Sequence, residues 1–333
     1  LNITVFNPLH VNLYRKAQTL RKTKTDRTDA RFLAAMLLSD DSEPYTPVSY
    51  QMEELKSLVR HRYRLVSMRS KLKVSVSRLI TLLFPELHTL VWSIHQASSY
   101  ALLAELPLAK DIASCHLTHL THLIATGSRG HYGRDKAIAI RELAQSSIGL
   151  DSPATAFELR QTIRMIQSLG QEIHALDKQI KLAMKQIDSP ILTVPGISFT
   201  LGAVILAEIG DILRFSTPAK LLAFAGLEPA TFQSGKFTAE NTSMVKRGST
   251  YLRWAILNAA RPITMRDDTF HGYYQQKRAE GKHQNVAIDH VGKKIVPVMF
   301  PLLKNNVAFV SQSSLSQTFF PAGFSFFFPP LFA

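Results

Sequence analysis

Residues 55–83 read LKSLVRHRYRLVSMRSKLKVSVSRLITLL, and this stretch decides the fold class that the sequence predicts. Apolar side chains occur at nearly every third or fourth position and form one stripe, in which Arg62 and Arg69 occupy two positions. The apolar members are Leu55, Leu58, Leu65, Leu72, Val76, Leu79 and Leu83. This spacing is typical of a long helix with a coiled-coil seam, here expected over residues 50–84. The sequence therefore predicts a mainly α fold.

A second long helix is expected over residues 154–188, where Leu159, Ile163, Ile166 and Ile173 begin a similar stripe. The two helices can pair as an antiparallel arm, or they can form a dimer, and the sequence does not choose between these arrangements. Residues 95–150, between the two helices, are expected to form a small helical insert.

The two ends of the chain differ from this helical middle. Residues 1–8 are expected to form a short buried strand, because Ile3, Val5 and Phe6 favour strands and Pro8 stops pairing. Helices are expected over residues 9–20 and 21–38, and no charged residue follows Lys304. The predicted boundaries are an N-terminal segment 1–46, a helical coiled-coil region 47–187, a C-terminal helical domain 188–304 and an atypical tail 305–333.

Composition narrows the class of partner. The 333 residues carry a formal net charge of +14, which favours nucleic acid over other partners. The single cysteine, Cys115, excludes an internal disulfide and a cysteine-based zinc site. No apolar run is long enough to cross a membrane, so a cytoplasmic protein without a membrane partner is expected.

Asp26 and Asp29 are the first candidate site. They lie three residues apart at the start of an expected helix, and therefore on one face of its first turn. Paired carboxylates of this kind suit Mg²⁺, which prefers hard oxygen ligands. The alternative is that they serve the helix itself, as an N-cap or as first-turn acids that pair with Lys24, Arg27 or Arg31.

The turn Pro195-Gly196-Ile197 is the second candidate, and it precedes an apolar helix rich in small residues. It resembles a helix-hairpin-helix element, in which a glycine such as Gly196 lets the backbone approach a DNA phosphate. An ordinary corner between two helices remains an equal alternative.

A one-signed basic seam over residues 60–78 is the third candidate. Such a run repels itself in a free helix and suits a polyanion, although a solvated helix face is the usual explanation. The cations of the seam are Arg60, Arg62, Arg64, Arg69, Lys71, Lys73 and Arg78.

Residues 273–283 also combine aromatic and basic side chains, and they either stack on bases or form a helix end capped by Gly281.

Residues 231–253 contain the candidate for catalysis. Ser234 and Gly235 form a turn-type pair that cations follow closely in the sequence. A hydroxyl nucleophile beside a basic, glycine-permissive loop suits phosphoryl transfer on a polyanion, whereas the alternative is a polar loop before a basic helix. The following cations are Lys236, Lys246, Arg247 and Arg253.

Several of these elements follow one another along the chain in a distinctive order. They are Lys24-x-Asp26-x-x-Asp29-Ala30, Val194-Pro195-Gly196-Ile197, Ala207-Glu208-Ile209-Gly210-Asp211-x-x-Arg214-Phe215, Leu222-Ala223-Phe224-Ala225-Gly226-Leu227-x-Pro229, Gln233-Ser234-Gly235, Lys246-Arg247-Gly248-Ser249-x-Tyr251-Leu252-Arg253 and Glu280-Gly281-Lys282. This ordered set closely resembles the IS110-family transposases of bacterial insertion sequences, including the IS116/IS902 group. The resemblance covers about residues 5–303.

The resemblance implies a fold and a reaction. It implies an RNase H-like (RuvC-like) N-terminal domain with an Asp-Glu-Asp-Asp metal tetrad, a coiled-coil region and a C-terminal transposase domain with a catalytic serine. On that pattern Asp26 and Asp29 match two Mg²⁺ ligands, and Ser234 matches the nucleophile. The implied partners are DNA and a structured bridge RNA, and a homo-oligomer associated with bacterial DNA is expected.

One departure from the family pattern gives a further expectation. The first Asp and the Glu of the tetrad lie upstream of the Asn7-Pro8 region in the family. The chain as given therefore resembles an N-terminally truncated copy that carries half of the tetrad, and it is expected not to transpose on its own. The alternative function is that of a non-catalytic helical protein that binds DNA or RNA through the seam at 60–78 and the turn at Gly196.

Overall fold

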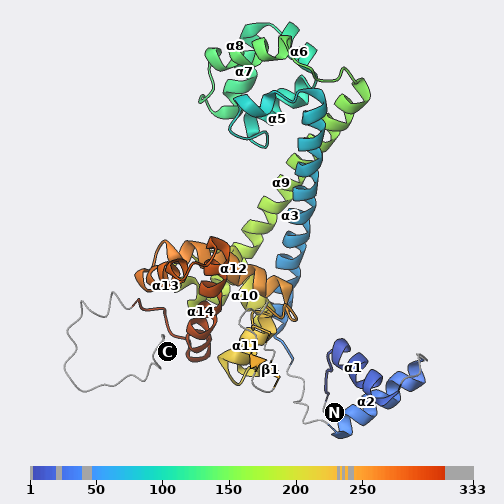
Figure 1. The fold of residues 1–333 in the computed structure, drawn as a ribbon, viewed down its shortest axis with the longest axis vertical. Coiled ribbons are helices and arrows are strands. Elements are labelled where there is room, and N and C mark those ends of the chain that lie inside the picture. The colour runs from blue at the N-terminus through green and yellow to red at the C-terminus, as the bar shows by residue number, and fades with distance from the viewer. Residues whose placement is uncertain are drawn as a thin grey trace, which may run out of the picture. The chain divides into compact units, whose positions relative to one another are not determined.

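The computed structural model describes residues 3–19, 25–39, 47–230, 233–234, 237–238 and 244–311. The chain divides near residue 52 into two compact units, each of which is mainly helical (Figure 1). The prediction of a mainly α fold is confirmed for these residues. No helix among them is long and apolar enough to cross a membrane.

The N-terminal unit contains helices α1 (Pro8–Gln18) and α2 (Asp26–Ser39). Residues 3–7 have no regular structure, and Ile3 and Val5 are 60% and 66% exposed, so the predicted buried strand is wrong. The reason is local. Asn7 Oδ1 accepts a hydrogen bond from the Leu9 amide at 2.9 Å, and Pro8 occupies the first helical position, so the Asn-Pro pair begins a helix rather than ending a strand.

The second unit is organised around α3 (Tyr50–Leu83) and α9 (Pro153–Ile187), which lie side by side and run antiparallel (Figure 1). Arg62 of α3 pairs with Asp177 of α9, and further along Arg78 pairs with Glu158. As the residue number rises along α3, it falls along α9. Of the two arrangements that the sequence leaves open, the helices thus adopt the intramolecular antiparallel arm.

A helical insert lies at one end of this arm (Figure 1). Its core includes Leu102, Leu103, Ile112 and Leu120, and it is continuous with the packed ends of α3 and α9. The helices expected within residues 95–150 are present, but the insert also includes α4, so it begins before residue 95. Its helices are α4 (Leu87–Leu90), α5 (Ala97–Glu105), α6 (Ala109–Ser114), α7 (Leu117–Ser128) and α8 (Arg134–Gln145).

The C-terminal part of the second unit packs around three helices, in which α12 contacts both α10 and α14. Gly292 makes this packing close, since a Cβ there would lie 2.8 Å from Leu257 Cδ2. The elements are η1 (Pro190–Thr193), α10 (Phe199–Ile209), η2 (Ile212–Arg214), α11 (Pro218–Ala225), β1 (Gln233–Ser234), β2 (Phe237–Thr238), α12 (Thr250–Thr264), α13 (Asp268–Ala279) and α14 (Gln284–Asn305).

The segment after α14 folds back on this part of the unit. The Phe309 amide donates to Thr193 Oγ1 at 2.8 Å, and the Ser311 hydroxyl donates to Asp267 Oδ2 at 2.6 Å. The predicted tail is thus described as far as residue 311, and residues 312–333 lie outside the described residues.

Candidate functional site

A short hairpin carries the predicted nucleophile. β1 pairs antiparallel with β2, with Ser234 opposite Phe237, and an isolated bridge joins Pro229 to Met244 at the base of the hairpin. The Val245 amide donates to the Glu228 carbonyl at 2.9 Å and extends this pairing. The backbone of Ser234 is thereby placed on a hairpin, whereas its side chain and the whole of Lys236 lie outside the described residues.

The loop that returns from the hairpin lies directly against the end of α11. Gly248 has φ +129°, and a Cβ there would lie 2.2 Å from the Phe224 carbonyl oxygen. The Ser249 amide donates to that same oxygen at 2.8 Å. Position 248 therefore requires glycine, both for its backbone conformation and for the close approach.

Arg253 holds the same loop from the side of α12. Its Nη1 donates to the carbonyls of Ala225 at 3.3 Å and Lys246 at 3.1 Å. The predicted phosphate ligand Arg253 is thus half-buried and engaged with the backbone, whereas Lys246 and Arg247 are exposed. Of the three predicted cations after the hairpin, Lys246 and Arg247 are the two placed to meet a ligand.

Glu208 is a buried carboxylate, 2% exposed, at the centre of this region. It accepts hydrogen bonds from Arg60 Nε at 2.7 Å, Arg60 Nη2 at 3.0 Å and the Ser249 hydroxyl at 2.8 Å. The hydrogen bond to Glu208 is the main cause that raises the pKa of Arg60. Since a buried charge is costly unless it is paired, the three side chains stabilise one arrangement of α3, α10 and the start of α12.

Sequence reasoning included Glu208 in a motif but assigned it no role. An available signal was its position as the single acid in an apolar helix, α10. Ser249 has a second function, because its hydroxyl accepts from the Leu252 amide at 3.1 Å and caps α12. The loop, the cap and the buried carboxylate are therefore parts of one hydrogen-bonded structure.

In the predicted basic seam on α3, Arg62 and Arg69 lie against α9, whereas Lys73 lies near His95. Arg62 donates to Asp177 from Nε at 2.6 Å and from Nη2 at 3.3 Å, so it joins α3 to α9. Arg69 lies against α9, with its Nη1 3.9 Å from the position of a Cβ on Gly170. Lys73 is half-buried and contributes to lowering the pKa of His95, behind the larger effect of burial.

Gly196 has φ +89°, as expected for the predicted tight turn. A Cβ there would lie 2.8 Å from the Ile263 amide nitrogen and 2.9 Å from the Pro262 carbonyl carbon. The close approach that requires glycine is therefore an approach to α12. The element before the turn is the 3₁₀ helix η1, and Ser198 caps α10 by accepting from the Leu201 amide at 3.3 Å.

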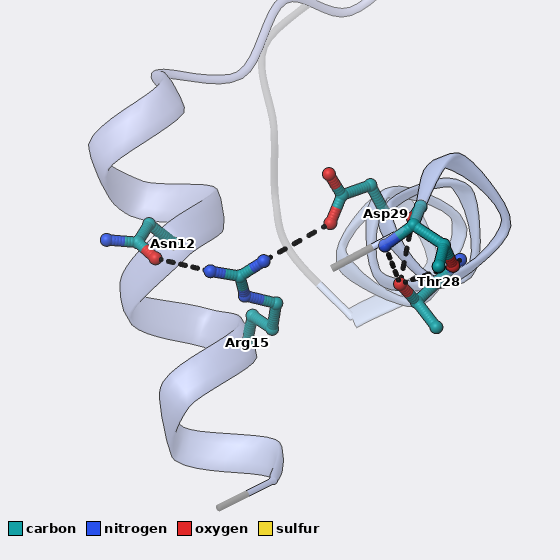
Figure 2. A network of polar contacts seen from close by, with 5 residues as sticks. Asn12, Arg15, Thr28 and Asp29 are labelled. Carbon is teal, nitrogen blue, oxygen red and sulfur yellow. Dashed lines mark hydrogen bonds and ion pairs between the residues drawn. The ribbon is translucent and has the colours of Figure 1, made fainter. Parts of the chain in front are cut away.

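The N-terminal unit places the two predicted metal ligands in the first turn of α2. Thr25 and Thr28 exchange hydrogen bonds at the start of this helix, which is the pattern of a helix cap. Asp29 Oδ1 lies 3.6 Å from Arg15 Nη1 of α1, and Arg15 also donates to Asn12 (Figure 2). Among the described residues the partner of Asp29 is thus Arg15, and neither Arg27 nor Arg31 pairs with it, whereas Lys24 lies outside the described residues.

Asp26 is exposed, and the side chain of Asp29 is 32% exposed, so water and an ion can reach both carboxylates. Their chemistry fits Mg²⁺, which often takes one or two carboxylates and completes its shell with waters and substrate phosphate. Among the described residues no group of three or more His, Cys, Asp or Glu side chains could hold a metal ion.

Helices α13 and α14 carry further cations. Burial raises the pKa of Asp289, and Lys293 and Lys246 act against this shift, which places Lys246 within electrostatic reach of α14. The side-chain nitrogens of Lys277 and Lys294 lie 5.4 Å and 5.5 Å from the centroid of the Tyr273 ring. The proposed helix end is also found, because α13 stops at Ala279 and Gly281 follows with φ +79°.

Two family models match the chain. One, described as the transposase IS116/IS110/IS902 family, matches residues 188–275, which include α10, α11, the hairpin, α12 and most of α13. The other, a transposase model of the IS110 DEDD type, matches residues 1–85. The chain belongs to the IS116/IS110/IS902 family of insertion-sequence transposases.

Relatives of this family agree with the assignment. An insertion element IS116 protein of Streptomyces clavuligerus is 25% identical over 305 residues, which cover 89% of this chain and 75% of that protein. An IS110 protein of Streptomyces coelicolor is 28% identical over 44% of this chain, and an IS900 protein of Mycobacterium paratuberculosis is 27% identical over 44%. The last two alignments span 38% and 39% of those relatives.

Proposed function

We propose that Ser234 is the nucleophile with which this transposase-family chain cleaves and rejoins DNA strands, and that the chain as given does not complete transposition on its own. The observation that supports this most directly is the loop 244–249, which is held between α11, α12 and Glu208 and presents Lys246 and Arg247 at the base of the hairpin that carries Ser234. A nucleophile on a hairpin whose base is fixed next to exposed cations suits phosphoryl transfer.

In the proposed step the Ser234 hydroxyl gives up its proton and its oxygen attacks a DNA phosphorus. A serine–phosphate bond forms, the bond to one DNA oxygen breaks, and that oxygen takes a proton and leaves as a hydroxyl. Rejoining is the reverse reaction with a different DNA hydroxyl. Lys246 and Arg247 would offset the charge that develops on the phosphate, while Arg253 and Gly248 keep the loop in place.

We further propose that Asp26 and Asp29 are the part of an RNase H-like (RuvC-like) site that this chain supplies. Mg²⁺, when bound there, would polarise a phosphate oxygen. Asp29 would have to release Arg15, which at 3.6 Å is a loose partner. We also propose that the arm is a coiled coil, that the chain forms a homo-oligomer, and that it binds a guide RNA and bacterial DNA. The high positive charge favours the nucleic-acid partners.

The test of the nucleophile is a covalent adduct. The chain is incubated with cognate insertion-sequence ends, denatured, and examined for DNA that stays attached to protein. The adduct should form with the unaltered chain and disappear with Ser234→Ala. Thr238→Ala is the matched control, because it removes a hydroxyl from the other strand of the same hairpin. An adduct that survives Ser234→Ala removes Ser234 from the proposed role.

A second function is favoured by the cations that remain exposed. Arg64 and Lys71 on α3 are exposed and make no ion pair among the described residues, and Lys246 and Arg247 are exposed as well. These groups suit a non-catalytic protein that binds DNA or RNA. The same assay separates the two functions, since such a protein binds the DNA ends with salt-sensitive affinity and forms no adduct.

A further inference from the structure

A cavity of about 240 Å³ lies where α3, α10 and α12 meet. Its walls include Tyr63 and Ser67 of α3, Val204 of α10, and Tyr251 and Trp254 of α12. Sites for drug-sized ligands usually measure about 300–1,000 Å³, so this cavity suits a smaller group such as a single ring system.

The aromatic residues form a three-ring cluster. The ring centroids of Tyr63 and Tyr251 are 4.9 Å apart at 77°, and those of Tyr63 and Trp254 are 5.7 Å apart at 82°. These are edge-to-face contacts, so no ring of the cluster is stacked on the face of another. Tyr63 is also 37% exposed, so the cluster can be reached from solvent. Flat surfaces of this kind bind a planar partner by stacking.

Three polar groups at the cavity have no hydrogen-bond partner among the described residues. Within the part of the chain that the structure describes, the Ser67 hydroxyl, the Trp254 indole N–H and the Tyr63 hydroxyl make no hydrogen bond. The Trp254 ring is half-buried, and a buried indole N–H normally finds a partner. The three groups are therefore available to a ligand that offers donors and acceptors around a flat ring.

The charges at the cavity are already paired. Arg62 is engaged with Asp177, and Arg60 lies 4.8 Å over the Tyr251 ring while it pairs with Glu208. The cavity is thus close to neutral and is a poor site for a phosphate. Its chemistry selects a neutral heteroaromatic ring.

The surroundings are positive. Helical periodicity places Lys56 and Lys73 on the same face of α3 as the cavity residues, about one turn beyond them at either end. Tyr251 and Trp254 also follow directly after the loop that carries Lys246 and Arg247. Cations on both sides of a neutral aromatic cavity match a chain whose rings are neutral and whose linkages are anionic.

We propose that this cavity binds one unstacked nucleobase of a single-stranded nucleic acid, stacked within the Tyr63–Tyr251–Trp254 cluster. This inference rests on the proposed function, because it assumes that the chain meets nucleic acid. It adds to that function a subsite that grips a base and not the backbone.

The test uses the fact that the chain has two tryptophans, Trp92 and Trp254. Trp92 is 96% exposed and can be replaced, so the full chain with Trp92→Phe reports on the cavity through Trp254 alone. Fluorescence is recorded during titration with oligothymidylate, with oligouridylate and with an abasic DNA strand of equal length. Binding of each strand is followed in parallel by anisotropy.

The expected result is saturable quenching of Trp254 by a strand with bases and none by the abasic strand. The thymidylate and uridylate arms show whether the base comes from DNA, from RNA or from both. Tyr63→Ala should weaken binding about tenfold, as loss of one stacking partner does. Tyr63→Phe, which keeps the ring and loses the hydroxyl, should weaken binding less than Tyr63→Ala, and Ser67→Leu should block binding by filling the cavity while leaving every ring in place.

Two results would overturn the inference. One is binding of oligothymidylate and oligouridylate by anisotropy without any change in Trp254 fluorescence, and the other is equal quenching by the abasic strand. Either result leaves the Ser234 adduct untouched. Loss of the adduct in Ser234→Ala, conversely, does not affect quenching, so the two proposals fail separately.

Discussion

At the scale of single residues, the pair Arg60–Glu208 holds the end of the loop 244–249, because Glu208 also accepts from the Ser249 hydroxyl. Glu208 is 2% exposed, and the Arg60 side chain is 40% exposed, so the pair lies at the edge of the core. Removing Arg60 leaves a buried carboxylate with Ser249 as its remaining side-chain partner. This pair should therefore be worth more than an ordinary surface ion pair.

We expect Arg60→Ala to lower the free energy of unfolding by about 2 kcal/mol, which is below the cost for a fully buried pair because Arg60 is partly solvated. Glu208→Gln should cost less, since it leaves no buried charge. Urea denaturation of both single variants and the double variant gives the coupling between them. Strict additivity of the two effects would contradict the interaction.

Gly248 offers a second test at this scale. Gly248→Ala forces a Cβ against the Phe224 carbonyl at a positive φ, and we expect it to destabilise the chain by about 1–3 kcal/mol and to abolish the Ser234 adduct. Gly272→Ala is the matched control, because nothing lies within 4 Å of its Cβ position in helix α13. It should be neutral or should stabilise by about 0.5–1 kcal/mol. Equal effects of the two changes would argue against a special role for Gly248.

Sequence patterns located the candidate residues but not their partners. The motifs marked Ser234, Lys246 and Arg253 because these residues are close together in the chain. The pairs Arg60–Glu208 and Arg62–Asp177 join residues that are 148 and 115 positions apart, and no local pattern contains that information. For this reason Arg62 was expected to bind nucleic acid, whereas the structure gives it a protein partner.

At the scale of elements, periodicity predicted α3 and α9 closely. It could not choose between an arm and a dimer, because an apolar stripe packs equally well against a helix of the same chain or of a second copy. The strand expected at residues 1–8 was wrong for a different reason. β-formers indicate a strand only where another strand can pair with them, and the Asn7 cap with Pro8 instead starts α1.

The insert at the end of the arm should weaken in acid. Burial lowers the pKa of His95, and Lys73 and His88 lower it further. A folded-state pKa below the unfolded value of about 6.5 means that protons favour the unfolded state. The contribution of His95 to stability is therefore present above about pH 6.5 and is lost as the pH falls through the lowered pKa.

Amide hydrogen exchange in α5 (Ala97–Glu105) measures this effect. Because the exchange rate itself depends on pH, the same measurement is made on the variant His95→Gln, and the two pH profiles are compared. Protection should fall between pH 7 and pH 5 in the unaltered chain. It should fall less in His95→Gln, which cannot gain the proton. The same loss of protection in both proteins would show that other groups govern the response.

At the scale of the whole molecule, the charge of +14 is the property that the sequence conveys best, because it needs no fold. The structure shows which of the cations are paired with carboxylates, as Arg62 is with Asp177, and are therefore not expected to contact DNA. Affinity for DNA should fall steeply with salt, and each phosphate contact contributes about one unit to the slope of log affinity against log salt.

We expect Lys73→Gln to reduce that slope by about one, and Arg62→Gln, whose cation is paired with Asp177, to leave it unchanged. Anisotropy of labelled DNA at several salt concentrations measures both slopes. If Arg62→Gln reduced the slope and Lys73→Gln did not, the assignment of roles within the basic seam would be reversed.

The way in which the insert joins the arm has a consequence for how this chain can be rebuilt. The Leu150 amide donates to the Leu82 carbonyl at 2.8 Å, and a Cβ on Gly149 would collide with the Leu83 carbonyl, so the entry and exit of the insert touch. A segment whose two junctions meet can be exchanged as a cassette. Replacing residues 84–149 with an unrelated reporter domain of adjacent termini should preserve the register of the two long helices, which Arg62–Asp177 and Arg78–Glu158 mark, once the apolar ends that the insert covered, such as Leu79 and Ile163, are made polar.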